Sequence, residues 1–179
     1  MFCALLGFLV LRLLEKYFNQ SVKRCKITST VKVIYDTREQ YPLDLQLFGF
    51  EMVRGTIKTG DYAVEGLDLC IERKRNTGEI SMNLGSKWKQ FEAELDRMVA
   101  FSHKYIVCEF TLDDIDTFPA GSGIPRKRWK YLRMSSGFIK KRFFEETEKR
   151  NIEVVFAGSK ERAEEYVADI ITSLIKNDI

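Results

Sequence analysis

Residues 59–74 read TGDYAVEGLDLCIERK, and this stretch holds two runs of alternating polar and apolar side chains around a central Glu-Gly pair. Alternation with period two is typical of a β-strand, and a Glu-Gly pair between two such runs predicts a tight turn. The stretch is therefore predicted to form an antiparallel β-hairpin. With a two-residue turn, we expect Val64 to lie opposite Leu67 and Asp61 opposite Cys70.

One face of this hairpin is predicted to carry chemistry and the other to join the core. Glu72 would be the diagonal neighbour of Asp61, and Lys74 would follow on the same face. The opposite face would carry an apolar stripe made of Tyr62, Val64, Leu67, Leu69 and Ile71. The inference depends on the parity of the turn, because a shift by one residue would separate the two carboxylates.

A third carboxylate is expected where an earlier strand ends. Residues 31–35, VKVIY, are rich in strand-forming residues and are followed by Asp36. Mg²⁺ prefers oxygen ligands and usually needs one or two protein carboxylates plus phosphate oxygens of a substrate. Asp61 and Glu72 are therefore predicted to bind a divalent metal, with Asp36 as a third or water-mediated ligand. Lys74 would orient the attacking water in a metal-dependent cleavage of a phosphodiester.

A structural alternative needs no chemistry at all. Asp61 and Glu72 could be solvated strand residues, and Lys74 could protect the edge of a sheet against pairing with another chain.

The acidic motifs resemble the signature of the XPF-type structure-specific nucleases, which reads D-x-R-E, then G-D, then E-R-K. The matching segments here are residues 36–39, 60–61 and 72–74, and the resemblance covers residues 28–179 with its strongest part at 31–98. It implies an α/β fold of the restriction-endonuclease-like class, with a mixed β-sheet flanked by helices in a single domain. It also implies a Mg²⁺- or Mn²⁺-dependent endonuclease that cleaves branched or flap DNA near single-strand/double-strand junctions, in DNA repair or recombination.

The resemblance assigns roles to individual residues. It places Asp36, Asp61, Glu72 and Lys74 at metal and catalytic positions. The supporting members of the site would be Arg38, Glu39 and Arg73.

Two departures from the family pattern stand out. The family usually has Asp four residues after the lysine, where this chain has Gly78, and Glu79 is a possible outer member of the site in its place. The sequence also shows no helix-hairpin-helix motif of the kind that eukaryotic and archaeal relatives use to hold DNA. We therefore expect DNA binding to come from other surfaces.

A basic tract with interleaved aromatic residues is the expected DNA-binding surface. Its cations would contact phosphates, and its rings would stack on unpaired bases. The predicted DNA-binding residues are Arg126, Lys127, Arg128, Lys130, Arg133, Lys140, Lys141 and Arg142. The alternative is a solvated helix face with Trp129 and Phe138 in the core. The net charge of +3 is too small to decide between them.

Several classes of function and location are not expected. The four cysteines lack C-x-x-C spacing and there is one histidine, so neither a zinc site nor a disulfide framework is predicted. No Walker-type motif is present, so no nucleotide cofactor is expected. Arg12 and Glu15 interrupt the apolar N-terminal run, so we expect no membrane span and an intracellular protein, in the cytoplasm or nucleoid, or in the nucleus of a eukaryote.

The sequence predicts an extension at residues 1–26 that is not part of the core, followed by one nuclease domain at 27–179. Further helices are predicted at residues 86–101, with Ser86 as the cap, and at 112–118, 138–150 and 160–176. Strands are predicted at residues 105–110 and 152–156. The resemblance suggests a homodimer. Alternative functions are a junction resolvase or restriction-type nuclease on the same fold, or a non-catalytic DNA-binding subunit.

Overall fold

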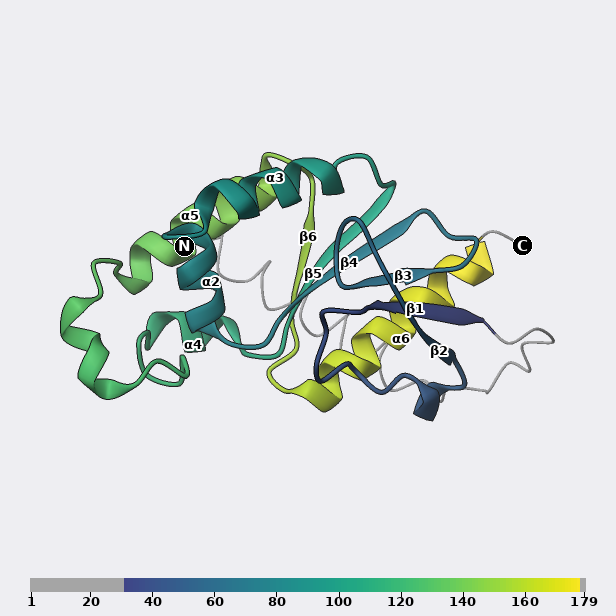
Figure 1. Cartoon of the computed structure of the whole chain (residues 1–179), viewed down its shortest axis with the longest axis horizontal. Coiled ribbons are helices and arrows are strands. Elements are labelled where there is room, and N and C mark those ends of the chain that lie inside the picture. The colour runs from purple at the N-terminus through teal and green to yellow at the C-terminus, as the bar shows by residue number, and fades with distance from the viewer. Residues whose placement is uncertain (1–30, 178–179) are drawn as a thin grey trace, which may run out of the picture.

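The computed structural model describes residues 31–177, and within them a six-stranded mixed β-sheet packs against helices on both faces (Figure 1). The strand order is β2-β1-β3-β4-β5-β6. The strands are β1 Lys32–Asp36, β2 Glu51–Gly55, β3 Tyr62–Val64, β4 Leu69–Lys74, β5 His103–Cys108 and β6 Glu153–Phe156. Strand β3 runs antiparallel to both β1 and β4, whereas the pairs β1–β2, β4–β5 and β5–β6 are parallel. The predicted mixed sheet flanked by helices is confirmed.

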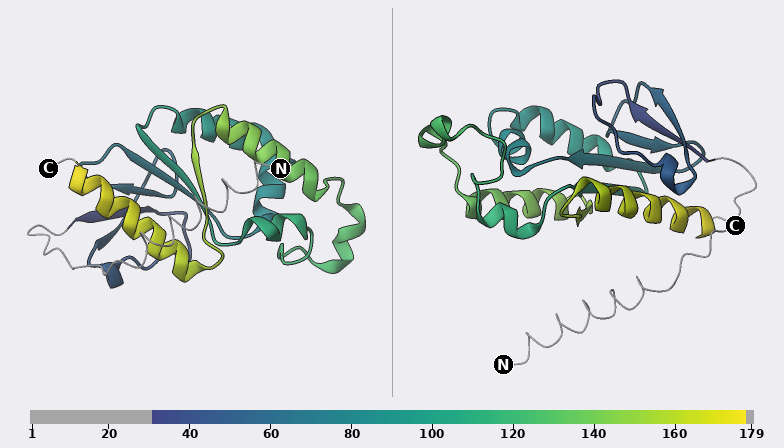
Figure 2. Two further views of the ribbon diagram at one scale, coloured as in Figure 1. Left: turned by 180° about the vertical axis from the view of Figure 1, so that it is seen from behind. Right: turned by 90° about the horizontal axis from the view of Figure 1, so that it is seen from below.

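The helices form two groups, which Figures 1 and 2 show on different parts of the sheet. The first group contains only α6, Lys160–Asn177. The second group contains α2 Thr77–Leu84, α3 Trp88–Met98, α4 Leu112–Asp116 and α5 Ser136–Glu148. Two short 3₁₀ helices, η1 Gln46–Phe48 and η2 Arg126–Tyr131, lie in the connections. The prediction for residues 1–26 lies outside the described residues.

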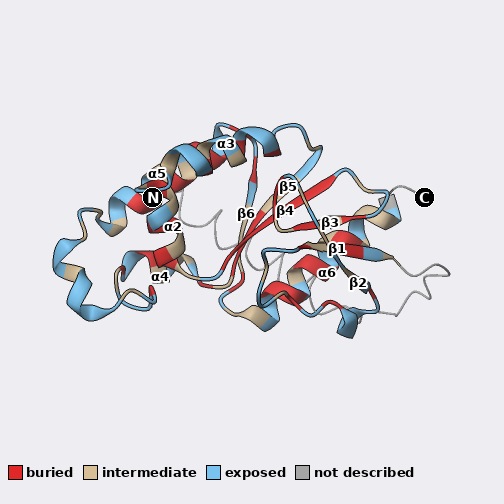
Figure 3. Cartoon of the chain, in the orientation of Figure 1, coloured by how far each residue is buried: buried red, intermediate tan, exposed pale blue. Residues whose placement is uncertain are grey.

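Each group of helices closes its own hydrophobic core. The core under α6 contains Tyr62, Val64, Leu69 and Ile71 of the hairpin, with Leu67 half-buried beside them, so the predicted apolar stripe is confirmed. The second core joins alternate sheet residues such as Cys70, Ile106 and Cys108 to α2, α3, α4 and α5. Strand β4 lies between the two cores, and all six of its residues are buried (Figure 3).

The hairpin forms as predicted, but its register differs by two residues. Tyr62 pairs with Ile71, whereas the two-residue turn would have paired Tyr62 with Leu69. The connection is longer because the turn closed by Leu67 N–H and the Val64 carbonyl is followed by Asp68, which bonds to the segment before β5: its carboxylate accepts the N–H of Ser102 and its carbonyl the N–H of His103. A shift by two residues leaves every side chain on its predicted face.

Most of the other predicted elements are present with small changes at their ends. The strands around residues 105–110 and 152–156 and the helices around 112–118, 138–150 and 160–176 are confirmed as β5, β6, α4, α5 and α6. Helix α3 begins at Trp88 rather than at a Ser86 cap, because its N-cap position is Lys87, which makes no side-chain cap.

Besides the two 3₁₀ helices, one strand and one helix were not predicted. Strand β2 lies at the sheet edge with a half-exposed, irregular pattern, and helix α2 follows Lys74 almost directly. Helix α2 has a usual start signal, because the side chain of Asn76 accepts the N–H of Glu79.

The glycine before Asp61 offers a test of how tightly the hairpin is held. Gly60 has φ +77°, and a Cβ there would lie 2.7 Å from Cys70 Sγ and 2.9 Å from the Ile71 carbonyl oxygen. Gly66 in the turn has φ +83°, and a Cβ there would have no atom within 4 Å. Gly66→Ala should cost only the backbone strain, about 1 kcal/mol of unfolding free energy. Gly60→Ala should cost about 3 kcal/mol, since overpacking adds to the strain.

Urea unfolding of the two variants measures both costs on one scale. Similar losses for Gly60→Ala and Gly66→Ala would contradict the close approach of Gly60 to β4.

Candidate active site

Asp61 lies between the ends of β1 and β4 and is held from both sides. Its carbonyl accepts the N–H of Asp36 at 2.9 Å, and its own N–H donates to the Ile71 carbonyl at 2.8 Å. Its side chain turns to β4, where Oδ2 accepts the N–H of Arg73 at 2.8 Å. The left-handed backbone at Gly60 lets the chain leave its regular strand pairing at this point. Asp61 is thereby fixed next to the segment that carries Glu72 and Lys74.

Glu72 and Lys74 form an ion pair inside the protein. Glu72 Oε1 and Lys74 Nζ are 2.5 Å apart, and their side chains are only 6% and 2% exposed. Both side chains leave β4 toward the second core, where Lys74 Nζ lies 4.9 Å from the ring centre of Phe91 on α3. The other carboxylate oxygen of Glu72, Oε2, is buried without a hydrogen-bond partner. A buried acceptor without a donor is costly, so this oxygen is suited to receive a cation or a donor from outside the chain.

The charges around this pair shift its ionisation. Burial raises the pKa of the Glu72 carboxyl, although the nearby Lys74 ammonium opposes the rise. Burial alone would lower the pKa of Lys74, but the carboxylates of Glu72 and Glu79 outweigh it and hold the pKa above its usual range. Lys74 therefore keeps its proton at neutral pH.

Asp61 has an ionisation suited to a functional carboxylate. Burial raises its pKa to about 6, against the opposing effects of the Arg73 N–H and the Lys74 charge. The negative charges of Glu39 and Glu94 contribute to this rise in the pKa of Asp61. Perturbed carboxylates of this kind gather at functional sites more often than elsewhere.

Asp36 is buried in the same region, but protein donors already occupy it. Its Oδ1 accepts the N–H and the Nε–H of Arg38 at 2.8 and 2.6 Å, and its Oδ2 accepts the Ile57 N–H at 2.9 Å. The hydrogen bond from the Arg38 side chain is the main reason why the pKa of Asp36 is lowered to about 2. Asp36 thus ties the loop after β1 to the segment after β2, and it fits a supporting position better than direct metal contact.

The Arg73 side chain links two loops on the opposite side of β4. Its guanidinium is 2% exposed and reaches Glu39 at 2.8 Å, Glu109 at 2.5 Å and the carbonyl of Tyr41 at 2.5 Å. The partners follow strands β1 and β5, and the Arg73 N–H holds Asp61. The predicted supporting residues Glu39 and Arg73 are therefore brought together, with Glu109 as a further member of the cluster.

The Gly78 departure from the family pattern has a steric reason. The Gly78 backbone packs so closely against the Ser122 carbonyl that an ideal Cβ would collide with it, so an aspartate would not fit there without a shift. The Glu79 side chain accepts the N–H of Arg75 at 3.0 Å and so closes the start of α2. Its charge still contributes to the raised pKa of Lys74, which leaves Glu79 at the edge of the site.

Glu94 on α3 is a residue that the sequence patterns did not single out. Its charge contributes to the raised pKa of both Asp61 and Glu72. It lies three residues after Phe91, which contacts Lys74, so the same face of α3 carries both. The sequence contains this spacing, but without the packing of α3 nothing separates Glu94 from the other charged residues of the helix.

The predicted basic tract divides into two parts. On α5, Lys140 pairs with Asp116 at 2.9 Å, Lys141 with Glu145 at 3.8 Å and Arg142 with Glu146 at 3.0 Å. For the earlier part, which contains Arg126, Lys127, Arg128, Lys130 and Arg133, no ion pair is formed with any residue of the described chain. Phe138 is 49% exposed, so it does not belong to the core.

Of the three carboxylates predicted to bind a divalent cation, two are suited to do so in this structure. Within residues 31–177, no three His, Cys, Asp or Glu side chains are grouped as a ready-made metal site. Asp61 and Glu72 nevertheless supply hard oxygen donors, and the partnerless Glu72 Oε2 is a suitable ligand for Mg²⁺, which needs few protein carboxylates. The pair fits, and Asp36 fits less well because its oxygens are already bonded.

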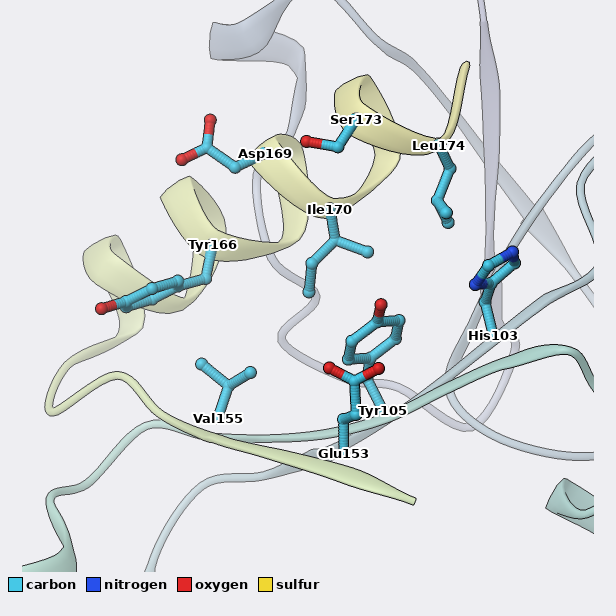
Figure 4. Close-up of a pocket in the computed structure, with 9 residues that line it drawn as sticks. All are labelled: His103, Tyr105, Glu153, Val155, Tyr166, Asp169, Ile170, Ser173 and Leu174. Atoms are coloured by element: carbon cyan, nitrogen blue, oxygen red, sulfur yellow. The ribbon is translucent and has the colours of Figure 1, made fainter. Parts of the chain in front are cut away.

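A separate hollow lies on the far side of the sheet, between α6 and strands β5 and β6 (Figure 4). Its volume is about 510 Å³, and its lining includes His103, Tyr105, Glu153, Asp169 and Leu174. None of the predicted site residues lines it. No helix of the described segment has the length and apolar character needed to cross a membrane.

Comparison with known proteins supports the fold assignment. No protein-family model and no curated protein matches the chain. Among solved structures, XPF from Aeropyrum pernix matches with a TM-score of 0.57 and 15% identity, covering 77% of this chain and 58% of that one. The same protein in complex with DNA matches with a TM-score of 0.53 and 16% identity, covering 82% and 66%. This chain therefore spans less than two thirds of either, and the shared property is the fold.

Asp61→Asn should stabilise the metal-free protein at neutral pH. A carboxyl whose pKa rises from 3.8 to about 6 on folding costs nothing below pH 3.8 and its full penalty above pH 6. The amide oxygen of Asn can still accept the Arg73 N–H. In EDTA at pH 7.5 we expect a gain of up to about 3 kcal/mol in unfolding free energy, which vanishes below about pH 4. Urea unfolding between pH 4 and 8 measures it, and equal stability at pH 7.5 would contradict the buried charge.

Asp36→Asn should destabilise the protein at neutral pH, in contrast to Asp61→Asn. A carboxyl whose pKa falls from 3.8 to about 2 on folding stabilises the protein above pH 3.8 and loses that effect as the pH falls toward 2. Asn places an NH₂ group against N–H donors, so we expect a loss of about 1–2 kcal/mol at pH 7.5. The same urea series tests it, and the loss should shrink in acid. A gain at pH 7.5 would show that Asp36 is not a structural acceptor.

Proposed function

We propose that this chain, which has an XPF-type nuclease-like fold, is a metal-dependent DNA endonuclease that cleaves branched or flap DNA near single-strand/double-strand junctions. The observation that carries the proposal is the buried pair Glu72–Lys74 beside Asp61, in which Glu72 Oε2 has no partner. A buried acidic oxygen, a second perturbed carboxylate and a charged amine in one place suit cleavage of a phosphodiester.

Asp61 and Glu72 would hold Mg²⁺ or Mn²⁺. When bound, such an ion lowers the pKa of water and offsets the charge that builds up on the phosphate. The chain supplies the orientation: the Arg73 N–H fixes one oxygen of Asp61, and the bond to Lys74 fixes one oxygen of Glu72.

Lys74 would act as a fixed positive charge. Because its pKa is raised, its ammonium can donate to an attacking water or to a phosphate oxygen but does not take up a proton at neutral pH. Phe91 covers it on one side and limits its motion. Asp36, Arg38, Glu39 and Arg73 would support the site by holding its loops in place.

The predicted basic tract would bind the DNA backbone. DNA as the partner is supported by the A. pernix XPF, which has a similar fold and was solved in complex with DNA. A junction resolvase or a restriction-type nuclease is the second candidate, because fold alone does not choose between substrates. We also propose that the protein acts inside the cell, in DNA repair or recombination, and that two copies form a homodimer. Sedimentation at micromolar concentration tests the homodimer.

Cleavage of a panel of labelled DNAs tests the activity. The protein and its Asp61→Ala variant are incubated with flap, fork, four-way junction and linear duplex DNA, with Mg²⁺ or with EDTA. We expect cuts near the junction of the flap and fork only with Mg²⁺, and a loss of at least about 100-fold in rate for Asp61→Ala. Leu47→Ala, a change at a 71% exposed side chain, is the control and should keep the full rate.

Three outcomes separate the alternatives. Preferred cutting of the four-way junction would favour a resolvase. Binding without cleavage by the unaltered protein would indicate the non-catalytic subunit. Equal products from the unaltered protein and Asp61→Ala would rule out the assigned site.

A further inference from the structure

The segment between α4 and α5 forms a projection that we call the η2 arm, residues 119–134. It extends away from the sheet at the left end of the molecule in Figure 1. The arm contains the loop 119–125 and the 3₁₀ helix η2, Arg126–Tyr131. Its side chains suggest a binding role that differs from that of the active site.

The arm concentrates positive charge within residues 31–177. It contains five cations, Arg126, Lys127, Arg128, Lys130 and Arg133, and no acidic residue. Residues 31–177 contain as many Asp and Glu as Lys and Arg, so this segment without the arm carries −5. Unlike the cations of α5, these five form no ion pair within the described residues. Among the residues that the structure describes, the arm is therefore the surface most suited to a polyanion.

The arm also presents an aromatic ring to solvent. Tyr131 is 72% exposed, and Lys130 Nζ lies 4.9 Å from its ring centre. Trp129 has a different role, because its Nε1–H donates to the Ile124 carbonyl at 2.9 Å and thereby closes the loop onto η2. One ring fixes the arm, while the other is available for stacking.

The base of the arm is tied to the helix that follows the active-site strand. Ser122 and Ile124 pack against Gly78 near the start of α2, and Met134 packs against Gly85 at its end. Ser81 Oγ also lies 3.8 Å from the sulfur of Met134. Helix α2 begins three residues after Lys74, so a ligand on the arm is held at a defined position relative to the site.

We propose that the η2 arm is a binding site for single-stranded DNA, in which its five cations contact phosphates and Tyr131 stacks on an unpaired base. Duplex DNA satisfies the charges but keeps its bases stacked inside, so the exposed ring favours an unpaired strand. The proposal rests on the proposed function only for the choice of DNA as the nucleic acid. In the cleavage reaction the arm would hold the unpaired branch of the substrate.

Binding without cleavage tests the arm separately from the active site. The full chain is titrated against fluorescent oligothymidylate in EDTA, and anisotropy gives the affinity at several salt concentrations. Tyr131→Ala should weaken binding about 5- to 100-fold, and Tyr131→Phe should keep most of the affinity, because loss of one base stack costs about 1–3 kcal/mol. Leu47→Ala, with a similarly exposed apolar side chain outside the arm, should leave the affinity unchanged.

The salt dependence separates charge from stacking. Lys127→Ala should reduce the slope of log affinity against log salt by about 0.7, the value for one phosphate contact on a single strand. Tyr131→Ala should lower the affinity at every salt concentration and leave the slope unchanged. Lys176→Ala on α6 is the charge control and should leave the slope unchanged.

Two results would overturn the proposal: unchanged affinity of Tyr131→Ala, or duplex DNA bound as tightly as the single strand with the same response to Tyr131→Ala. Its failure is distinguishable from failure of the proposed function. If Asp61→Ala abolishes Mg²⁺-dependent cleavage while Tyr131→Ala binds normally, the nuclease stands and the arm proposal falls. If Tyr131→Ala loses binding while the unaltered protein cuts nothing, the arm proposal stands and the nuclease falls.

Discussion

The ion pair between Glu72 and Lys74 is the constraint on which the rest of the site depends. Both side chains come from β4, the strand that lies between the two cores and is buried along its whole length. Removing two charges from water is expensive, and each is tolerated here only because the other is present. Such a pair is weak evidence for stability, and it is better explained by what the partnerless oxygen and the charged amine can do together.

The side chains of β4 alternate between the two faces of the sheet, and each face carries a different set of charged groups. Glu72 and Lys74 face α3, while Arg73 between them turns to the opposite side and joins Glu39 and Glu109. A single strand thus supplies both the side chains that we propose as reactive groups and the residue that holds the surrounding loops. Strand β4 also positions Asp61, because the Asp61 carboxylate accepts the Arg73 N–H.

The hairpin and its two faces could be predicted from the sequence, because period-two alternation is a local pattern. The mixed sheet was predicted from the family resemblance. The register of the hairpin could not be predicted, since it depends on how Asp68 is bonded to Ser102 of a distant loop. Glu94 was missed because its role depends on where α3 packs. The occupied oxygens of Asp36 and the ion pairs of Lys140–Arg142 were likewise invisible, because their partners are set by tertiary contacts.

The uneven distribution of charge has a consequence for the encounter between this protein and any polyanion. Within residues 31–177, a compact cationic tip adjoins a body whose net charge is −5, and such a separation of charge produces a torque in an external field, so this part of the molecule turns before it makes contact. Collisions would therefore begin at the tip, and added salt would slow productive arrival by removing this alignment before it affects any contact in the interior.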